Sequence, residues 1–189
     1  MPHKWVKTMP NKASGAFMLV VVGVVLGVSG CQKTSSPPAT PSTAFTTMQV
    51  GDTAPPFSRL DTAGDSVHVG PNQQPTLLNL WATWCAPCLE EFPDLESIHQ
   101  DLSPVGLRVL GLNVEEVDAA ALSDFAAELG ASFTIVLDPP ATLQDTYRAI
   151  AMPTTFFIDR NGIVRRVWTG RLPEDAHTEI ATLLKDITS

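Results

Sequence analysis

The chain has 189 residues, 44% of them hydrophobic, and a formal net charge of −8 at pH 7. This length suits one folded domain with a short appendage. Twenty Asp and Glu residues outnumber twelve Lys and Arg, which argues against a protein that binds nucleic acid through a basic surface.

The first 30 residues are typical of an export signal. Lys4, Lys7 and Lys12 precede an apolar run from Phe17 to Val28 that contains no charged residue. This run is shorter than the roughly 20 residues that cross a bilayer as a helix, and small residues follow it, as in a secretory signal. An uncleaved membrane anchor is the alternative. Either interpretation places the rest of the chain outside the cytoplasm, in the periplasm or an equivalent space.

The signal ends in the motif VSGC at residues 28–31, which resembles the lipobox of bacterial lipoproteins. The resemblance implies cleavage before Cys31 and a lipid anchor on this cysteine, where each buried methylene adds about 0.8 kcal/mol. Residues 32–47 are rich in Pro, Ser and Thr, a composition that cannot form a core and predicts an extended tether. We therefore predict a signal peptide over 1–30, a lipidated cysteine with its tether over 31–47 and a folded domain over 48–189.

Short apolar stretches between turn signals open the folded part. Residues 50–69 predict one or two short strands joined at an Ala-Gly turn. Thr76–Trp81 predicts a compact buried strand. From about Ala86 to Leu102 apolar residues recur every three positions, which predicts a helix with a kink at Pro93.

The second half of the domain alternates strands and helices. A strand over Gly106–Val114 would make the preceding strand, helix and strand a right-handed crossover with parallel strands. Asn-Gly at residues 161–162 between two apolar segments predicts a hairpin. We further predict a helix over 118–129, a strand over 132–137, a helix over 141–150, a hairpin over 154–168 and a helix over 173–187. Together they predict a three-layer α/β domain, a small mixed sheet with helices on both faces.

Two of the three cysteines, Cys85 and Cys88, lie where the first long strand is followed by a helix. Unpaired N–H groups at a helix start favour an anion, and in such Cys-x-x-Cys pairs the pKa of the first thiol falls from about 8.5 to roughly 3.5–7.5. Cys88 is close enough to form a disulfide with Cys85 and to resolve a mixed disulfide formed there. The alternatives are a structural disulfide or half a zinc site, but zinc takes four ligands and no second cysteine pair is present.

The WCAPC motif and Met152-Pro153-Thr154 before the hairpin resemble the thioredoxin superfamily. Within it, the lipobox, the N-terminal strands, the inserted helix and strand, and Glu-Phe-Pro after the second cysteine are similar to the TlpA, ResA and CcmG group of membrane-tethered thiol-disulfide oxidoreductases. The resemblance implies a thioredoxin-like fold over about residues 48–188. It also implies an extracytoplasmic reductant of protein disulfides, in many relatives for cytochrome c maturation, with apocytochrome c or an assembly factor as partner. We expect an upstream membrane electron donor and neither cofactor nor metal.

Roles for the site residues follow from the same resemblance. Cys85 matches the nucleophile and Cys88 the resolving thiol. Pro153 matches a cis-proline, and Met152 before it meets the substrate backbone. Independently of the resemblance, Trp84 flanks the cysteine pair in the sequence and is predicted to shape the rim of the site.

Glu91 matches the active-site glutamate of the ResA type. It lies three residues after Cys88, at a spacing where helical side chains meet, so its carboxyl could exchange protons with that thiol and raise its pKa. A solvated helix carboxylate is the alternative. Asn79 occupies the place of the buried aspartate of thioredoxin, which leaves proton handling to Glu91. For Glu115 and Glu116, after the second long strand, we expect solvated carboxylates. The alternative is that they tune the local potential at the edge where the site lies.

Two other functions use the same fold. A copper module would bind Cu(I) through Cys85, Cys88 and Met152, but Ala151 and Met152 replace the histidine that copper-delivery relatives carry before the hairpin. A peroxidase would require the Pro-x-x-x-Thr-x-x-Cys setting of peroxiredoxins, whereas Thr83 lies only two residues before the cysteine and no matching proline precedes it. The sequence therefore favours a dithiol oxidoreductase.

Overall fold

The computed structural model describes residues 47–139 and 141–188. The predictions of a signal peptide over 1–30, of lipidation at Cys31 and of a tether up to residue 46 therefore lie outside the described residues. Among the helices of the described ranges, none is both long and apolar enough to span a membrane.

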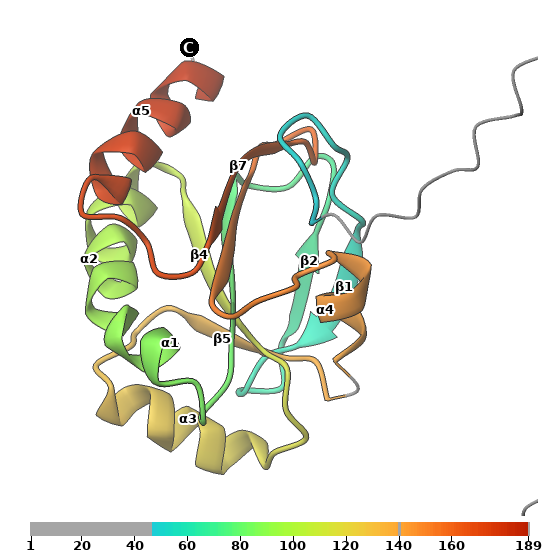
Figure 1. Ribbon diagram of the computed structural model, residues 1–189, viewed down its shortest axis with the longest axis vertical. Coiled ribbons are helices and arrows are strands. Elements are labelled where there is room, and N and C mark those ends of the chain that lie inside the picture. The colour runs from blue at the N-terminus through green and yellow to red at the C-terminus, as the bar shows by residue number, and fades with distance from the viewer. Residues whose placement is uncertain (1–46, 140, 189) are drawn as a thin grey trace, which may run out of the picture. The chain divides into compact units, whose positions relative to one another are not determined.

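A five-stranded mixed sheet with the order β5-β4-β3-β6-β7 forms the centre of the domain (Figure 1). The parallel strands are β3 (Thr76–Trp81), β4 (Arg108–Asn113) and β5 (Thr134–Leu137). β6 (Thr154–Ile158) pairs antiparallel with β3, and β7 (Val164–Thr169) pairs antiparallel with β6. Every residue of β3 is buried because both faces of the sheet are covered. The predicted strand positions and the thioredoxin-like α/β fold are confirmed.

Four helices cover one face of the sheet: α1 (Ala86–Glu90), α2 (Phe92–Leu102), α3 (Ala119–Glu128) and α5 (Ala176–Thr188). The apolar side chains of these helices form one core cluster with the strand residues that point to this face. Trp81, at the end of β3, is fully buried in this cluster, as predicted.

A β-hairpin and one short helix cover the other face (Figure 1). The hairpin consists of β1 (Phe57–Leu60) and β2 (Ser66–Val69), which pair antiparallel as a separate sheet, and the helix is α4 (Thr142–Thr146). Leu78 and Leu80 of β3 pack here, because alternate residues of a strand point to opposite faces. Asn79 lies on the opposite face of β3, together with Leu77 and Trp81, which pack in the cluster that contains α1 and α2.

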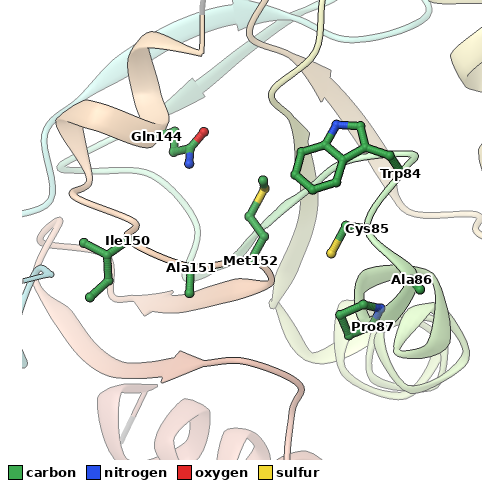
Figure 2. A pocket seen from close by; sticks show the side chains of 8 residues that line it. All are labelled: Trp84, Cys85, Ala86, Pro87, Gln144, Ile150, Ala151 and Met152. Atoms are coloured by element: carbon green, nitrogen blue, oxygen red, sulfur yellow. The ribbon is translucent and has the colours of Figure 1, made fainter.

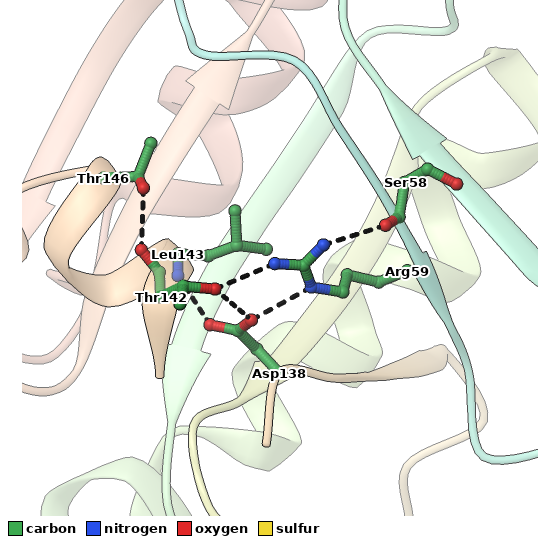
Figure 3. Close-up of polar contacts among 6 residues, drawn as sticks. All are labelled: Ser58, Arg59, Asp138, Thr142, Leu143 and Thr146. Carbon is green, nitrogen blue, oxygen red and sulfur yellow. Dashed lines mark hydrogen bonds and ion pairs between the residues drawn. The ribbon is translucent and has the colours of Figure 1, made fainter. Parts of the chain in front are cut away.

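Asp138, just after β5, fastens the hairpin to α4 (Figure 3). Its fully buried carboxylate accepts hydrogen bonds from the backbone N–H of Leu143 (2.6 Å) and the hydroxyl of Thr142 (3.0 Å). Arg59 of β1 completes the group, with Nε 3.0 Å from Asp138 Oδ1 and Nη2 2.8 Å from the Thr142 hydroxyl. Asp138 thus fixes the start of α4, which carries part of the site described below.

The N-terminal segment also pairs with the backbone of both outer strands of the central sheet. The N–H of Gly51 donates to Val164 O (2.8 Å), and the N–H of Val164 donates to Asp52 O (2.9 Å). At the opposite edge, the N–H of Thr62 donates to Ile135 O of β5 (3.0 Å). Residues 51–62 therefore reach from one edge of the sheet to the other.

Two predicted helices differ from the structure. The segment 86–102 is interrupted at Glu91, and a new helix starts at Phe92, so that Pro93 lies in a first turn, where its missing N–H costs little. The helix predicted over 141–150 covers only α4, because Arg148 adopts a left-handed conformation with φ 51° that a helix cannot continue through.

Candidate active site

Cys85 and Cys88 form a disulfide at the start of α1, with sulfurs 2.01 Å and Cα atoms 5.3 Å apart. Cys85 is the N-cap residue, and its carbonyl accepts hydrogen bonds from the N–H groups of Cys88 (2.9 Å) and Leu89 (3.2 Å). Cys85 retains 5% of its surface exposed, whereas Cys88 is fully buried. The predicted pairing and location of the two cysteines are confirmed, although α1 is only five residues long.

Cys85 borders a surface pocket of about 420 Å³. The pocket is lined by Trp84, Cys85, Ala86, Pro87, Gln144, Ile150, Ala151 and Met152. Figure 2 shows Trp84, Cys85 and Pro87 on one side of the pocket and Ile150, Ala151 and Met152 on the other. The peptide bond between Met152 and Pro153 is cis, as predicted for this position.

The rim of the pocket is apolar and accessible. Trp84 is 68% exposed and Ile150 66% exposed. Large apolar side chains so open to solvent mark surfaces that contact other molecules when they gather around a site. The structure therefore brings together Trp84 and Met152, as predicted, and adds Gln144 and Ile150. Both of these lie within the segment 141–150 predicted as a helix and gave no signal of their own.

Glu91 lies at the break between α1 and α2 and is fully buried. Its Oε1 accepts a hydrogen bond from Asn79 Nδ2 (2.6 Å), and its Oε2 accepts one from the backbone N–H of Leu172 (3.0 Å). The backbone N–H of Glu91 donates to the carbonyl of Cys88 (3.3 Å). The alternative of a solvated carboxylate is therefore wrong for this residue.

Burial raises the pKa of Glu91 to about 7. The hydrogen bonds from Leu172 and Asn79 and the charge of Arg171 oppose this rise, while the charge of Asp94 adds to it. The Arg171 guanidinium bonds the exposed Glu90 carboxylate (3.1 Å). Near neutral pH the Glu91 carboxyl can therefore both accept and release a proton.

Asn79 links Glu91 to the central sheet. Its Nδ2 donates to Glu91 and also to the hydroxyl of Thr155 on β6 (2.9 Å). Its buried Oδ1 has no hydrogen-bond partner among the residues that the structure describes. The sequence identified Asn79 as a departure from thioredoxin but not its bond to Glu91. The alternation of β3 carries that signal, since residues 77, 79 and 81 share the face toward α1 and α2.

Glu115 is not the solvated carboxylate that we expected from the sequence. It is half-buried and accepts hydrogen bonds from the backbone N–H of Thr83 (2.5 Å), the Thr83 hydroxyl (3.0 Å) and Asn113 Nδ2 (3.1 Å). Glu116 is exposed, as expected. Glu115 thus contacts the loop that leads to Cys85, and sequence reasoning missed it because Thr83 lies 32 residues away in the chain.

Within residues 47–139 and 141–188, no three or more His, Cys, Asp and Glu side chains are grouped so that they could hold a metal ion. The sulfur pair of the site is oxidised to a disulfide, which leaves neither cysteine as a thiolate ligand in this structure.

The fold and the cysteine pair at the head of α1 define a thioredoxin-like thiol-disulfide oxidoreductase. The chain belongs to the AhpC/TSA family, whose sequence model matches residues 50–167.

Similar proteins carry the same activity in their names. Thiol-disulfide oxidoreductase ResA of Geobacillus kaustophilus is 33% identical over 134 residues, 70% of this chain and 76% of the relative. The protein of the same name from Bacillus subtilis is 32% identical over 136 residues, 71% of this chain and 75% of the relative. The crystal structure of a Chlorobium tepidum protein assigned as thiol:disulfide interchange protein DsbE is 30% identical, with a TM-score of 0.63 over 74% of this chain and 99% of that one. The predicted enzyme class is confirmed.

Proposed function

We propose that this protein is an extracytoplasmic, lipid-anchored reductant of protein disulfides. One observation carries the proposal: Cys85 faces an open apolar pocket, while Cys88 is sealed beneath it in the same segment as a buried carboxyl group. This arrangement exposes the Cys85 sulfur to a partner protein and keeps the Cys88 sulfur away from solvent until it attacks the mixed disulfide.

In the reduced protein, Cys85 is the attacking thiolate. Its sulfur attacks one sulfur of the substrate disulfide, the substrate S–S bond breaks, and the other substrate sulfur leaves as a thiolate that takes up a proton. The product is a mixed disulfide between Cys85 and the substrate. Trp84, Ile150 and Met152 surround this bond and hold the apolar residues that flank the substrate cysteine.

Cys88 then resolves the mixed disulfide. Its thiol loses a proton to the Glu91 carboxylate, and its sulfur attacks the Cys85 sulfur. The bond between Cys85 and the substrate breaks, and the second substrate sulfur leaves as a thiolate that takes up a proton as Glu91 returns to its carboxylate form. The Cys85–Cys88 disulfide forms, so two electrons pass from the protein to the substrate. Glu91 suits this role because its pKa of about 7 matches the operating pH of a general base. A membrane dithiol donor returns the pair to the reduced state.

The client and the location are inferred from the resemblance noted in the sequence. The TlpA, ResA and CcmG group supports an apocytochrome c or an assembly factor as the substrate, in cytochrome c maturation. The basic and apolar first 30 residues and the VSGC motif support export and lipid attachment at Cys31. No nucleic acid, cofactor or metal is required by this chemistry.

A trapping experiment tests the proposed nucleophile and its substrate. Cys88→Ser, expressed in the native cell envelope, should accumulate mixed disulfides through Cys85 that mass spectrometry can identify. Cys85→Ser should accumulate none and should lose disulfide reductase activity. Cys85→Ser that still reduced disulfides, or trapping through the wrong cysteine, would show that the nucleophile is wrongly assigned.

The direction of electron flow is tested separately by the reduction potential. Equilibration of the pure domain with glutathione buffers should give a value nearer to that of thioredoxin, about −270 mV, than to that of the oxidant DsbA, about −120 mV. A value near the second figure would make the protein an oxidant.

Lipid attachment is tested by membrane fractionation. Wild-type protein should sediment with membranes and incorporate labelled palmitate, and Cys31→Ala should do neither. Equal incorporation by both proteins would contradict anchoring at this cysteine.

A further inference from the structure

Glu115 holds the loop before Cys85 at the point where β3 and β4 end. Its two carboxylate oxygens grip Thr83, with Oε2 2.5 Å from the backbone nitrogen and Oε1 3.0 Å from the hydroxyl oxygen. The carboxylate is itself fixed by Asn113, whose Nδ2 donates to Oε2 (3.1 Å) and whose Oδ1 accepts from the Glu115 N–H (2.9 Å). Asn113 is fully buried and lies in register with Trp81, the last residue of β3. The Glu115 carboxylate is therefore held in place by a buried residue of the central sheet.

The conformation of the loop from Ala82 to Trp84 depends on these hydrogen bonds to Glu115. A turn closed by the Cys85 N–H on the Ala82 carbonyl (3.1 Å) shapes the loop, and the N–H of Thr83 is bonded to Glu115. A partly buried N–H that loses its acceptor is destabilising, so the loop would have to move to find another. Trp84 and Cys85, the next two residues, line the pocket and would move with it (Figure 2).

We propose, on the basis of the function proposed above, that Glu115 is a positioning residue for the attack by Cys85. It fixes Thr83 and thereby sets where the Trp84 side chain and the Cys85 sulfur meet a bound substrate. It acts through two oriented acceptor atoms and not through its charge. A negative charge near a thiol disfavours the thiolate, so a role through charge alone would slow the attack, and removal of the charge would speed it.

Three variants separate geometry from charge. Glu115→Gln keeps an oxygen that accepts from Thr83 N–H and Asn113, and its amide can donate to the Thr83 hydroxyl, but the charge is lost. Glu115→Ala loses both the grip and the charge. Glu116→Gln is the matched control, because Glu116 is the next residue, carries the same charge and is exposed.

The measurement is the second-order rate constant with which the fully reduced protein reduces a fluorogenic peptide disulfide, together with the pH profile of Cys85 alkylation by iodoacetamide. We expect Glu115→Ala to be about tenfold slower with the peptide, Glu115→Gln to stay within about threefold of wild type, and Glu116→Gln to match wild type. The pKa of the Cys85 thiol should fall similarly in both Glu115 variants. An unchanged rate for Glu115→Ala, even with lower thermal stability, overturns the proposal, and so does a Glu115→Gln protein as slow as Glu115→Ala.

A second pair of variants covers the case in which Glu115→Ala does not fold. Thr83→Val removes the hydroxyl donor and keeps the shape, whereas Thr83→Ser keeps the donor. We expect Thr83→Val to be about threefold slower with the peptide and Thr83→Ser to match wild type, and equal rates for the two overturn the proposal.

Cys85→Ser distinguishes this failure from failure of the proposed function. If Cys85→Ser still reduces the peptide, the assigned nucleophile is wrong whatever Glu115 does. If Cys85→Ser is inactive and Glu115→Ala is as fast as wild type, the positioning role alone is lost.

Discussion

The domain buries one carboxylate at the junction of α1 and α2 and another at the junction of β5 and α4, and the two have different surroundings. Glu91 accepts hydrogen bonds from two uncharged donors, an amide of Asn79 and the backbone of Leu172. Asp138 accepts from a backbone N–H and a hydroxyl but also pairs with the Arg59 guanidinium at 3.0 Å. Both side chains are fully buried, so burial alone does not distinguish a structural carboxylate from a reactive one.

The charged partner makes the difference. A buried carboxylate next to a guanidinium is compensated as an anion, and removing the guanidinium leaves an unpaired buried charge. A buried carboxylate without such a partner holds its proton to a higher pH. We therefore interpret Asp138 as a structural anchor and Glu91 as a group prepared for proton transfer. The variants below test this comparison, in order of decreasing expected effect.

Asp138→Ala should be the most destabilising of these changes. It leaves the buried N–H of Leu143 without its acceptor and removes the partner of the Thr142 hydroxyl and of Arg59, whose side chain is 32% exposed. Together these losses should cost about 3 kcal/mol in the free energy of unfolding. Urea unfolding of the oxidised protein measures this. Asp145→Ala, an exposed change on the same helix, is the control and should cost less than about 0.5 kcal/mol. A loss below about 1 kcal/mol for Asp138→Ala would contradict its role as an anchor.

Glu91→Gln should remove a pH dependence of stability. In the folded oxidised protein the pKa of Glu91 is about 7, against 4.5 as the ordinary value. Between these values the folded state binds more protons than the unfolded state, so the stability of the wild type falls as the pH rises through this window and levels off above it. At about 1.4 kcal/mol per pKa unit, the fall between pH 5 and pH 8 should be about 2 to 3 kcal/mol.

Urea unfolding of wild type and Glu91→Gln at pH 5 and pH 8 checks this prediction. The difference in free energy between the two proteins, and not the stability of either alone, is the relevant quantity. The same difference at both pH values would mean that Glu91 is already ionised in the folded protein at pH 5.

Asn79→Ala should raise the pKa of Glu91 further, because the hydrogen bond from the Asn79 amide lowers it. Carbon-13 NMR of the labelled Glu91 carboxyl in the oxidised protein measures the midpoint directly. Thr155→Val is the control. It removes the hydroxyl that accepts the other hydrogen bond from Asn79 and leaves the bond from Asn79 to Glu91 in place. An unchanged or lower midpoint in Asn79→Ala would show that the Asn79 hydrogen bond does not lower this pKa.

Glu90→Gln should have the smallest effect. Glu90 pairs with Arg171, but their side chains are 62% and 46% exposed, and such surface pairs contribute between about 0 and 1 kcal/mol. Urea unfolding in low and high salt should show little change in either. A large loss would mean that the Arg171 pair, and with it the electrostatic setting of Glu91, is stronger than its exposure indicates.

The sequence predicted the strands well because their signals are local. The uniformly apolar Thr76–Trp81 stretch and the Asn-Gly turn at 161–162 mark their elements without reference to the rest of the chain. The helix break at Glu91 was predicted only as a kink at Pro93, because the three-residue apolar pattern continues across both helices. The length of α4 was overestimated because the left-handed conformation of Arg148 has no signature in an arginine.

The site divides in the same way. Cys85, Cys88 and the Met152-Pro153 peptide belong to short motifs and could be identified from spacing and resemblance. The partners of Glu91 and Glu115 could not, because they depend on how distant segments pack together, helix on strand for Glu91 and strand beside strand for Glu115. Asn79 lies 12 residues from Glu91 in the chain and Thr83 lies 32 from Glu115. The packing of the α1–α2 junction on β3 brings Asn79 to Glu91, and the paired ends of β3 and β4 bring Thr83 to Glu115.

The reach of residues 51–62 across the central sheet has a consequence for self-association. Outer strands carry unpaired backbone groups that can template the addition of another chain, and native proteins cover or interrupt them. Here residues 51–62 cover part of both edges of the central sheet, at Val164 of β7 and at Ile135 of β5. Proteolytic removal of residues 51–62 would expose both edges of the sheet at once. Protection against aggregation is therefore concentrated in this one segment near the start of the domain.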